Sequence, residues 1–368
     1  MATLWQKARL LRGLIDGEVA YGGPFYVDVD VTRRCNLHCL GCQYQSSRTR
    51  ILPSSGPTVR DVPFEQIQSL SADLRKLGTR EVLLVGEGEP LLHPRICDIV
   101  SAFKSADCKV QVFTNGTLID HRLARALLES GLDVLRVSMW ASSPNEFRLV
   151  NPGVSPSLFD ATLAGVRSIT GLRSQLGSRR PAVILTQPLN RHNYQSISRR
   201  VRLAHQLGCD GVAFDTYRHW GDEFAPVALS AEQIQEACEL LMDARRVAAS
   251  LALHHNIDRM LLKYRLGETS WQSVPCYAGW FFSRIRVDGT VVPCGMCSMI
   301  LGNIREEPFE KVWNGPEYRA FRRQASVPGG VASFGPGCDC NWCCYATDNS
   351  LVHRYARWIP RTWGGRSD

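Results

Sequence analysis

The feature that most constrains the fold is a regular alternation of short apolar segments and helix-like segments between residues 25 and 250. Alternation of this kind implies a parallel sheet with right-handed crossovers. Six strand–helix units are present, short of the eight in a closed barrel, so the sequence predicts an α/β fold, a partial (β/α)6 TIM barrel. The expected strands lie at 25–31, 81–90, 109–119, 133–142, 182–190 and 211–218, and the expected helices at 64–78, 120–130, 157–172, 193–208 and 231–250.

The regions that flank this alternation have different patterns. Leu10, Leu11, Leu14 and Ile15 lie near helical spacing and predict a short amphipathic helix that caps the barrel. The alternation stops after about residue 250, and the chain from Pro275 is rich in Gly, Pro, Trp and Cys. We therefore expect an N-terminal helix (1–24), a barrel (25–250), a smaller cysteine-rich module (251–350) and a C-terminal tail (351–368).

Composition excludes two classes of partner. The formal charge of +8 comes mainly from scattered arginines, without a basic run interleaved with aromatic residues, so we expect no nucleic-acid partner. No segment reaches eighteen consecutive apolar residues, and the N-terminus lacks a secretory signal, so we expect no membrane partner and a cytoplasmic location. In that reducing compartment, the 14 cysteines indicate metal clusters rather than disulfides.

Three cysteines follow the first expected strand: Cys35, Cys39 and Cys42, with spacings of three and two residues. A four-iron cluster uses four cysteine thiolates, so a loop with three leaves one iron open to a substrate or cofactor. No further cysteine follows within the next fifty residues, which favours a reactive cluster over an electron-transfer ferredoxin. Zinc is the alternative, with His38 as a fourth ligand, although the loop is tight for tetrahedral coordination.

The cysteine loop, a GEP turn and a TNG turn all follow expected strands, so they share the rim where parallel sheets carry their chemistry. Over residues 20–345, the Cx3Cx2C loop, the GEP turn and the open alternating sheet resemble the radical S-adenosylmethionine (SAM) superfamily. The resemblance implies that Cys35, Cys39 and Cys42 hold a [4Fe–4S] cluster whose open iron binds SAM. It also implies a flavodoxin- or ferredoxin-type reductant and one-electron cleavage of SAM to a 5′-deoxyadenosyl radical, which abstracts hydrogen from a substrate.

The same resemblance assigns SAM contacts to residues at the strand ends. Gly88, Glu89 and Pro90 form the turn similar to the family element that meets the methionine amino group. Ser138 and Gln187 stand where the family often contacts the ribose or the carboxylate of SAM. The alternative for either residue is a polar side chain that closes a strand.

One position departs from the family pattern. The residue before the third cysteine is commonly an aromatic that packs on adenine, but here it is Gly41. Either Tyr44 replaces that aromatic, or another side chain covers the adenine.

A second group of cysteines occupies residues 276–344. Seventeen residues separate Cys276 from Cys294 across an expected hairpin with its turn at Asp288–Gly289, and the CDCNWCC segment follows later. The arrangement resembles the auxiliary-cluster extension of the superfamily, known in a long (SPASM) and a shortened (twitch) form. This resemblance favours one auxiliary [4Fe–4S] cluster, with a second cluster or a zinc ribbon as alternatives. The expected ligands are Cys276, Cys294, Cys340 and Cys343, with Cys297, Cys338 and Cys344 to spare, and Cys338 or Cys344 can replace one of the four.

The shortened extension most resembles enzymes that act on aminocyclitols, aminoglycosides and related sugars. We therefore expect an oxidoreductase that converts an alcohol to a ketone in a small polyol or aminosugar intermediate of antibiotic biosynthesis, with the auxiliary cluster as electron acceptor. The alternatives are epimerisation or dehydration of such a sugar, modification of a peptide, and a non-catalytic iron–sulfur or zinc scaffold.

Oxidation requires a base near the carbinol, and epimerisation requires a thiol that returns hydrogen. Cys297 is one candidate for such a thiol, among the spare cysteines. Any candidate base is alternatively a structural or substrate-binding group. The candidate bases beyond the last strands are Asp215, Tyr217, His219, Asp222 and Glu223, and then His254, His255 and Asp258.

Overall fold

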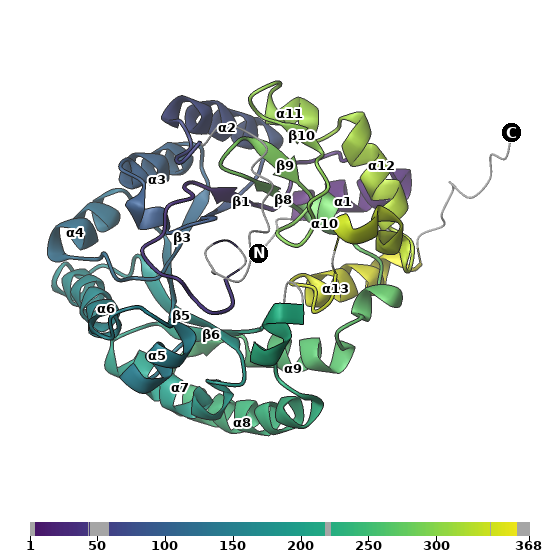
Figure 1. Ribbon diagram of the computed structural model, residues 1–368. Helices are drawn as coiled ribbons and strands as arrows, with labels where there is room; N and C mark the ends of the chain where they lie inside the picture. Colours follow the sequence, from purple (N-terminus) through teal and green to yellow (C-terminus); the bar gives the residue numbers. More distant parts are fainter. Residues whose placement is uncertain (1–3, 43, 45–58, 218–221, 339, 359–368) are drawn as a thin grey trace, which may run out of the picture.

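The computed structural model describes residues 4–42, 44, 59–217, 222–338 and 340–358. A curved sheet lines the inside of a ring, and helices cover its outer side (Figure 1). The described strands form one sheet in the order β10-β9-β8-β1-β2-β3-β4-β5-β6-β7. The barrel strands are β1 (Tyr26–Asp30), β2 (Glu81–Val85), β3 (Lys109–Thr114), β4 (Val134–Ser138), β5 (Ala182–Leu189), β6 (Gly211–Thr216) and the short β7 (His254–His255).

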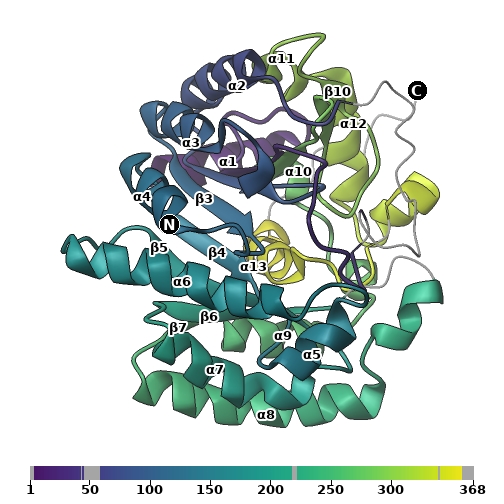
Figure 2. The ribbon, with the colours of Figure 1, turned by 60° about the vertical axis from the view of Figure 1, so that its left-hand side comes forward.

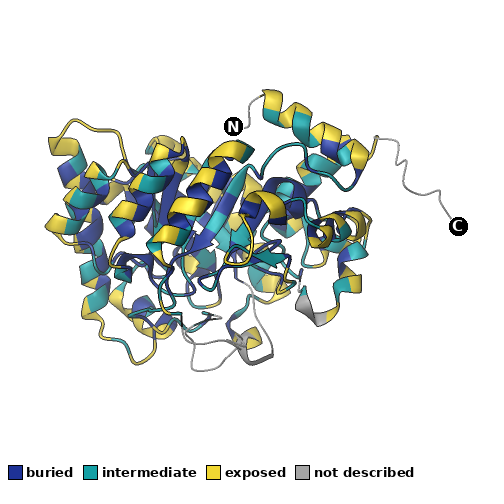
Figure 3. Ribbon diagram, turned by 90° about the horizontal axis from the view of Figure 1, so that it is seen from above, coloured by how far each residue is buried: buried dark blue, intermediate teal, exposed yellow. Residues whose placement is uncertain are grey.

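The predicted partial barrel is confirmed: β1 to β6 are parallel and neighbours in chain order. Their outward residues, such as Val27, Val82 and Leu135, are fully buried beneath the helices, which show exposed outer faces in Figure 3. The helix α3 was not among the expected segments. The outer helices are α2 (Phe64–Leu77), α3 (Ile96–Ser105), α4 (His121–Glu129), α5 (Pro144–Val150), α6 (Ser157–Gln175), α7 (Ile197–Gln206), α8 (Ala231–Ser250) and α9 (Ile257–Leu266).

The cysteine-rich region continues the barrel sheet. Strand β8 (Phe282–Ile285) is parallel to β1, with Tyr26 opposite Phe282, and the predicted hairpin pairs β8 with β9 (Thr290–Val292). Strand β10 (Gly302–Asn303) adds to the edge. Residues far apart in the sequence therefore lie side by side across the β1–β8 seam. The helices of this region are α10 (Ala278–Phe281), α11 (Phe309–Val312), α12 (Pro316–Ala325) and α13 (Ala346–Ala356).

The short 3-10 helices occupy connections between these elements. One of them, η1, follows the GEP turn, and another, η3, follows β6. Their bounds are η1 (Pro90–Leu92), η2 (Tyr194–Ser196), η3 (Asp222–Val227), η4 (Ser270–Gln272) and η5 (Gly330–Gly337).

The N-terminal helix α1 (Leu4–Asp16) forms as predicted but buries only part of its apolar face. Leu10 and Leu14 pack against the core, whereas Leu11 and Ile15 are exposed. The reason is that α1 packs against the Trp280 ring at Gly13, where an added Cβ would lie 2.8 Å from that ring.

The segment expected to be a tail from residue 351 is helical through Ala356, in α13. This helix lies between α9 and the α10–α12 group, where the ring of outer helices is open (Figure 1). The turned view of Figure 2 shows α6, α7 and α8 along one outer wall, with α13 nearer the interior. Among the described residues, none of the helices is both long and apolar enough to cross a membrane.

Candidate active site

The cysteine triplet lies in the loop that leaves β1. The backbone N–H of Cys42 donates to the Cys39 carbonyl at 3.0 Å, which makes a tight turn. Two further N–H groups point at sulfur: Leu37 N lies 3.5 Å from Cys35 Sγ, and Tyr44 N lies 3.4 Å from Cys42 Sγ. Donors aimed at sulfur stabilise a thiolate, the form that binds metal.

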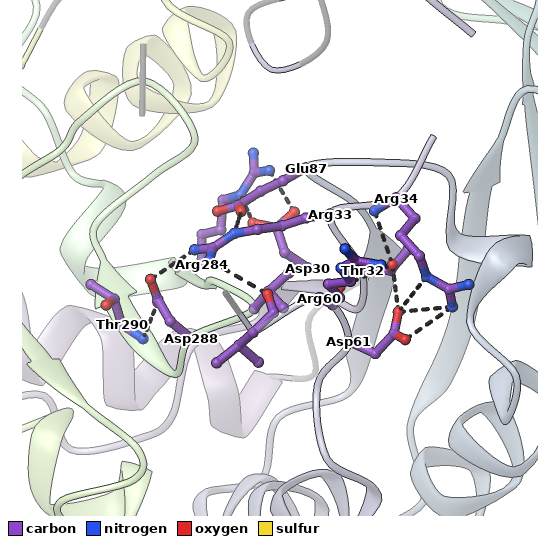
Figure 4. Close-up of polar contacts among 12 residues, drawn as sticks. Asp30, Thr32, Arg33, Arg34, Arg60, Asp61, Glu87, Arg284, Asp288 and Thr290 are labelled. Atoms are coloured by element: carbon purple, nitrogen blue, oxygen red, sulfur yellow. Dashed lines mark hydrogen bonds and ion pairs between the residues drawn. The ribbon is translucent and has the colours of Figure 1, made fainter. Parts of the chain in front are cut away.

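Ion pairs hold this loop against both sides of the β1–β8 seam (Figure 4). Arg33 donates to Glu87 of the second strand's loop, and at 2.8 Å to Asp288 of the β8–β9 turn. Beneath it, Arg284 of β8 contacts the fully buried Asp30 through two nitrogens, at 2.8 and 2.6 Å. The triplet therefore sits on a rigid base that joins the barrel to the cysteine-rich region.

The GEP turn packs directly against the cysteine loop. A Cβ on Gly88 would lie 2.1 Å from the Arg34 carbonyl, so only glycine fits. Glu89 donates its backbone N–H to that carbonyl at 2.7 Å, and Pro90 begins the helix η1.

The Glu89 carboxylate joins three loops. It accepts hydrogen bonds from Leu91 N, Thr114 Oγ1 and Asn115 N at 3.0, 2.5 and 2.7 Å. Asn115 in turn donates to Asn36 Oδ1, beside Cys35, at 2.9 Å. Burial raises the pKa of Glu89 to about 7, although these hydrogen bonds oppose the shift. Glu89 thus connects the GEP and TNG turns to the cysteine loop.

The two polar residues predicted on β4 and β5 lie on different faces of the sheet. Ser138 shares a cavity of about 40 Å³ with Cys39 and Asn115, and accepts a hydrogen bond from Trp140 Nε1 at 3.1 Å. Its cross-strand partner is Thr186, so these two share a face. The next residue, Gln187, faces the other way because side chains alternate along a strand. The Gln187 amide is fully buried and has no hydrogen-bond partner among the described residues.

An aromatic pair packs on Gly41. A Cβ at this position would lie 2.2 Å from the Tyr217 ring, and Tyr217 meets Trp140 edge to face with centroids 6.2 Å apart. Tyr44 lies elsewhere, with its ring 5.8 Å from the Arg284 guanidinium carbon. The space of the expected aromatic at position 41 is therefore taken by Tyr217, from the end of β6.

This packing makes the effect of a methyl group at Gly41 predictable. The variant Gly41→Ala is expected to displace Tyr217 or the cysteine loop, at a cost of about 1–3 kcal/mol. Bound iron and thermal unfolding of the reconstituted protein measure the effect. Gly171→Ala is the matched control, because Gly171 is exposed on α6 with nothing within 4 Å. Equal iron content and unfolding temperature in the two variants would contradict this packing.

The second cysteine group converges beside β8 and β9. Met296 N lies 3.4 Å from Cys294 Sγ, and Cys297 N is 3.4 Å from the Cys294 carbonyl, which repeats the turn of the first loop. Burial, and then the nearby thiols of Cys297, Cys276 and Cys340, raise the pKa of Cys294. Cys297 is buried, and its backbone pairs with that of Cys338 in an isolated antiparallel β-bridge; the sulfur of Cys338 is 3.7 Å from Cys340 Sγ. The part of the chain described here contains no group of three His, Cys, Asp or Glu side chains placed to hold a single metal ion.

A cavity of about 480 Å³ occupies the barrel lumen. Alternate residues of the strands line it, and it extends to the cysteine-rich region at Cys344 and Tyr345. Asp215 lines it at the end of β6, half-exposed, and accepts a 2.6 Å ion pair from Lys263 of α9. Lys263 itself is almost completely buried. Burial alone would lower its pKa, but the Asp215 carboxylate and the nearby Cys344 and Cys343 thiols together outweigh burial and raise it.

Of the other predicted bases, His254 and His255 also line this cavity. Asp258 does not: its carboxylate is mostly exposed and pairs with Arg245 at 2.7 Å. His219 lies outside the described residues, and Asp222 and Glu223 lie in η3, where the structure describes the backbone alone.

Two important residues of the cavity were not predicted. Lys263 occupies the buried face of α9 with Ile257 and Met260, at helical spacing, and a lysine on such a face was the available signal. Asp28 lines the cavity from β1, and its signal was the alternation of acids with valines in YVDVD.

Comparison with known proteins agrees with this geometry. Residues 29–171 match the family model of the radical SAM superfamily, and residues 276–345 match the SPASM iron–sulfur cluster-binding domain. The chain is 26% identical, over 86% of its length and 90% of the relative's, to the AdoMet-dependent heme synthase of Methanosarcina barkeri. It is 24% identical, over 83% of its length and 81% of the relative's, to the PqqA peptide cyclase of Gluconobacter oxydans.

Solved structures share the fold. Streptococcus suis SuiB superposes with a TM-score of 0.65 at 15% identity, over 94% of this chain and 78% of SuiB. The protein anSMEcpe with bound AdoMet gives 0.62 at 14% identity, over 91% of this chain and 98% of its own. The chain therefore carries a radical SAM domain followed by a C-terminal SPASM domain, the domains of a radical SAM enzyme whose cofactors are SAM and [4Fe–4S] clusters that include an auxiliary one.

Proposed function

We propose that this enzyme oxidises an alcohol to a ketone in a small polyol or aminosugar bound in the barrel cavity. The main supporting observation is that this cavity extends from the barrel to the cysteine-rich region: Asp215 at the end of β6 and Cys344 both line it. Its volume of about 480 Å³ falls in the range of small-molecule sites. Charged and polar side chains among its lining residues suit a hydroxylated substrate better than an apolar one.

The cysteine geometry supports the assignment of the clusters. Cys35, Cys39 and Cys42 would hold the SAM-binding cluster, and N–H groups directed at two of their sulfurs suit thiolate ligands. The auxiliary cluster would be held by Cys276, Cys294, Cys340 and Cys343. Burial, and then the nearby thiols of Cys343, Cys340 and Cys297, raise the pKa of Cys276, so these thiols lie as close together as ligands of one cluster would.

The protein's own groups would position the substrate and take up its proton. When bound, the SAM cluster with SAM supplies the radical that removes the carbinol hydrogen, and the auxiliary cluster supplies an electron acceptor. The Asp215 carboxylate would accept the hydroxyl proton, because it faces the cavity and Lys263 holds one of its oxygens at 2.6 Å. Loss of a hydrogen atom from the carbinol carbon makes the hydroxyl far more acidic, so a carboxylate suffices as the base.

Cys344 favours epimerisation as a second candidate function, because its side chain lines the same cavity. In that reaction the carbon radical takes the thiol hydrogen atom, and the sulfur radical left behind takes one electron from the external reductant and one proton from solvent. Turnover in D2O separates the two reactions. Oxidation yields a product two mass units lighter than the substrate, whereas epimerisation yields one that has gained deuterium at carbon.

The expected result is the lighter product, formed equally well by Cys344→Ala. A deuterated product that Cys344→Ala no longer forms would assign epimerisation. Turnover of a peptide, with no change in any polyol, would overturn the proposed substrate class.

A further inference from the structure

Asp28 is the one carboxylate lining the cavity that has no hydrogen bond or ion pair with any described residue. The other two acids of the lining are engaged. Glu81 accepts from Lys109 at 3.4 Å and from Gln111, and Asp215 pairs with Lys263 at 2.6 Å.

No nearby cation is committed to Asp28. Arg284, across the seam on β8, gives two of its nitrogens to Asp30. Arg136 on β4 faces the same cavity but donates to the neutral Gln111 at 2.7 Å. The charges of Arg284 and Arg136 still favour the Asp28 carboxylate, whereas the Asp30 and Glu81 carboxylates repel it.

The environment therefore disfavours the ionised form. Burial is the largest effect and raises the pKa of Asp28 to about 7. Asp28 is partly shielded from solvent, so its carboxylate, without a bonded partner, destabilises the ligand-free protein at higher pH. A cationic ligand would remove that penalty.

Two tyrosine rings adjoin the same part of the cavity. Tyr26 precedes Asp28 on the lumen face of β1, and Tyr345 follows Cys344; their ring centroids are 6.2 Å apart. Ring faces attract ammonium groups. A carboxylate beside two tyrosine rings combines the features that recognise an alkylammonium group.

We propose that Asp28, with Tyr26 and Tyr345, binds the ammonium group of an amine-bearing polyol in the barrel cavity. The inference rests on the proposed function and narrows its substrate class, from polyols in general to aminated ones.

Matched probes test this binding site without turnover. Isothermal titration of the reconstituted holoenzyme, saturated with SAM at pH 8, compares 1-amino-1-deoxysorbitol with sorbitol, which differs by a hydroxyl in place of the amine. We expect the amine to bind about tenfold more tightly or better, as for a charge-assisted hydrogen bond. Asp28→Asn should abolish the preference, whereas the control Glu81→Gln should keep it, because Glu81 is already engaged by Lys109 and Gln111.

A pH series on the unmodified enzyme gives an independent readout. Between pH 8 and pH 6, protonation of Asp28 should weaken binding of the amine about tenfold, while an alkylamine stays protonated throughout. Sorbitol binding should not change over this range. Equal binding of the two probes, no binding of the amine, or an amine preference that survives Asp28→Asn would overturn the proposal.

These outcomes are separable from failure of the proposed function. If Asp28→Asn loses the preference for the amine but no polyol is oxidised, the amine-binding site is supported and the proposed oxidation is refuted. If polyols are oxidised but the enzyme binds the amine and sorbitol equally, the proposed oxidation is supported and the amine-binding site is refuted.

Discussion

Simultaneous replacement of Cys35, Cys39 and Cys42 by alanine should abolish SAM cleavage and leave the auxiliary iron in place. The three thiols are expected to bind one cluster, and the other cysteine group lies elsewhere, beside β8 and β9. After anaerobic reconstitution, iron and sulfide should fall to about half of the wild-type content, one cluster of two. Chromatography should detect no 5′-deoxyadenosine above background.

The chain offers a matched control for the loss of thiols. Cys97 and Cys238 are half-buried and stand apart from both cysteine groups in the sequence, so their alanine variants should keep full iron content and SAM cleavage. Persistent SAM cleavage in the triple variant would contradict the assignment of the SAM cluster to this loop.

Replacing Asp215 by asparagine should reduce ketone formation by about 10²–10⁴-fold, the usual contribution of a general base. Production of 5′-deoxyadenosine should continue, because the change lies in the cavity and leaves the cysteine loop intact. Asparagine keeps the size of the side chain but cannot take a proton. The measurement is the ratio of ketone to 5′-deoxyadenosine, by mass spectrometry.

Asp258→Asn is the control for this change, because its carboxylate is exposed and pairs with Arg245 outside the cavity. Its ratio should equal that of the wild type. If Asp215→Asn lowered SAM cleavage and ketone formation by the same factor, its role would be structural and another group would be the base.

The barrel could be predicted because its signals are local. Strands β1 to β6 are short segments of five to eight residues, and all but β2 are followed by a helix that the sequence pattern predicts, so the alternation implies the parallel order. The pairing of β8 with β1 could not be predicted, since it joins residues more than 250 positions apart. The local sequence pattern also could not show which face of α1 is buried, because this depends on the close approach of Gly13 to Trp280.

Parts of the candidate site could likewise be predicted from the sequence, and other parts could not. The Cx3Cx2C loop and the GEP turn are contiguous motifs and can be recognised from spacing. The lumen depends on the closure of the sheet, which brings Asp28 of β1, Asp215 of β6 and Lys263 of α9 to one cavity. Position 41 illustrates the difference. The sequence shows that a glycine replaces the aromatic residue common in the family, but only the folded structure shows that the Tyr217 ring fills that space.

The central claim is that a radical generated at the cysteine loop reaches a carbinol carbon in the barrel cavity. The direct test is the mass of 5′-deoxyadenosine formed with aminopolyols that carry deuterium at their carbinol carbons. The account predicts 5′-deoxyadenosine one mass unit heavier, in the wild type and in Asp215→Asn alike. Unlabelled 5′-deoxyadenosine, together with an oxidised product that keeps all of its deuterium, would contradict it.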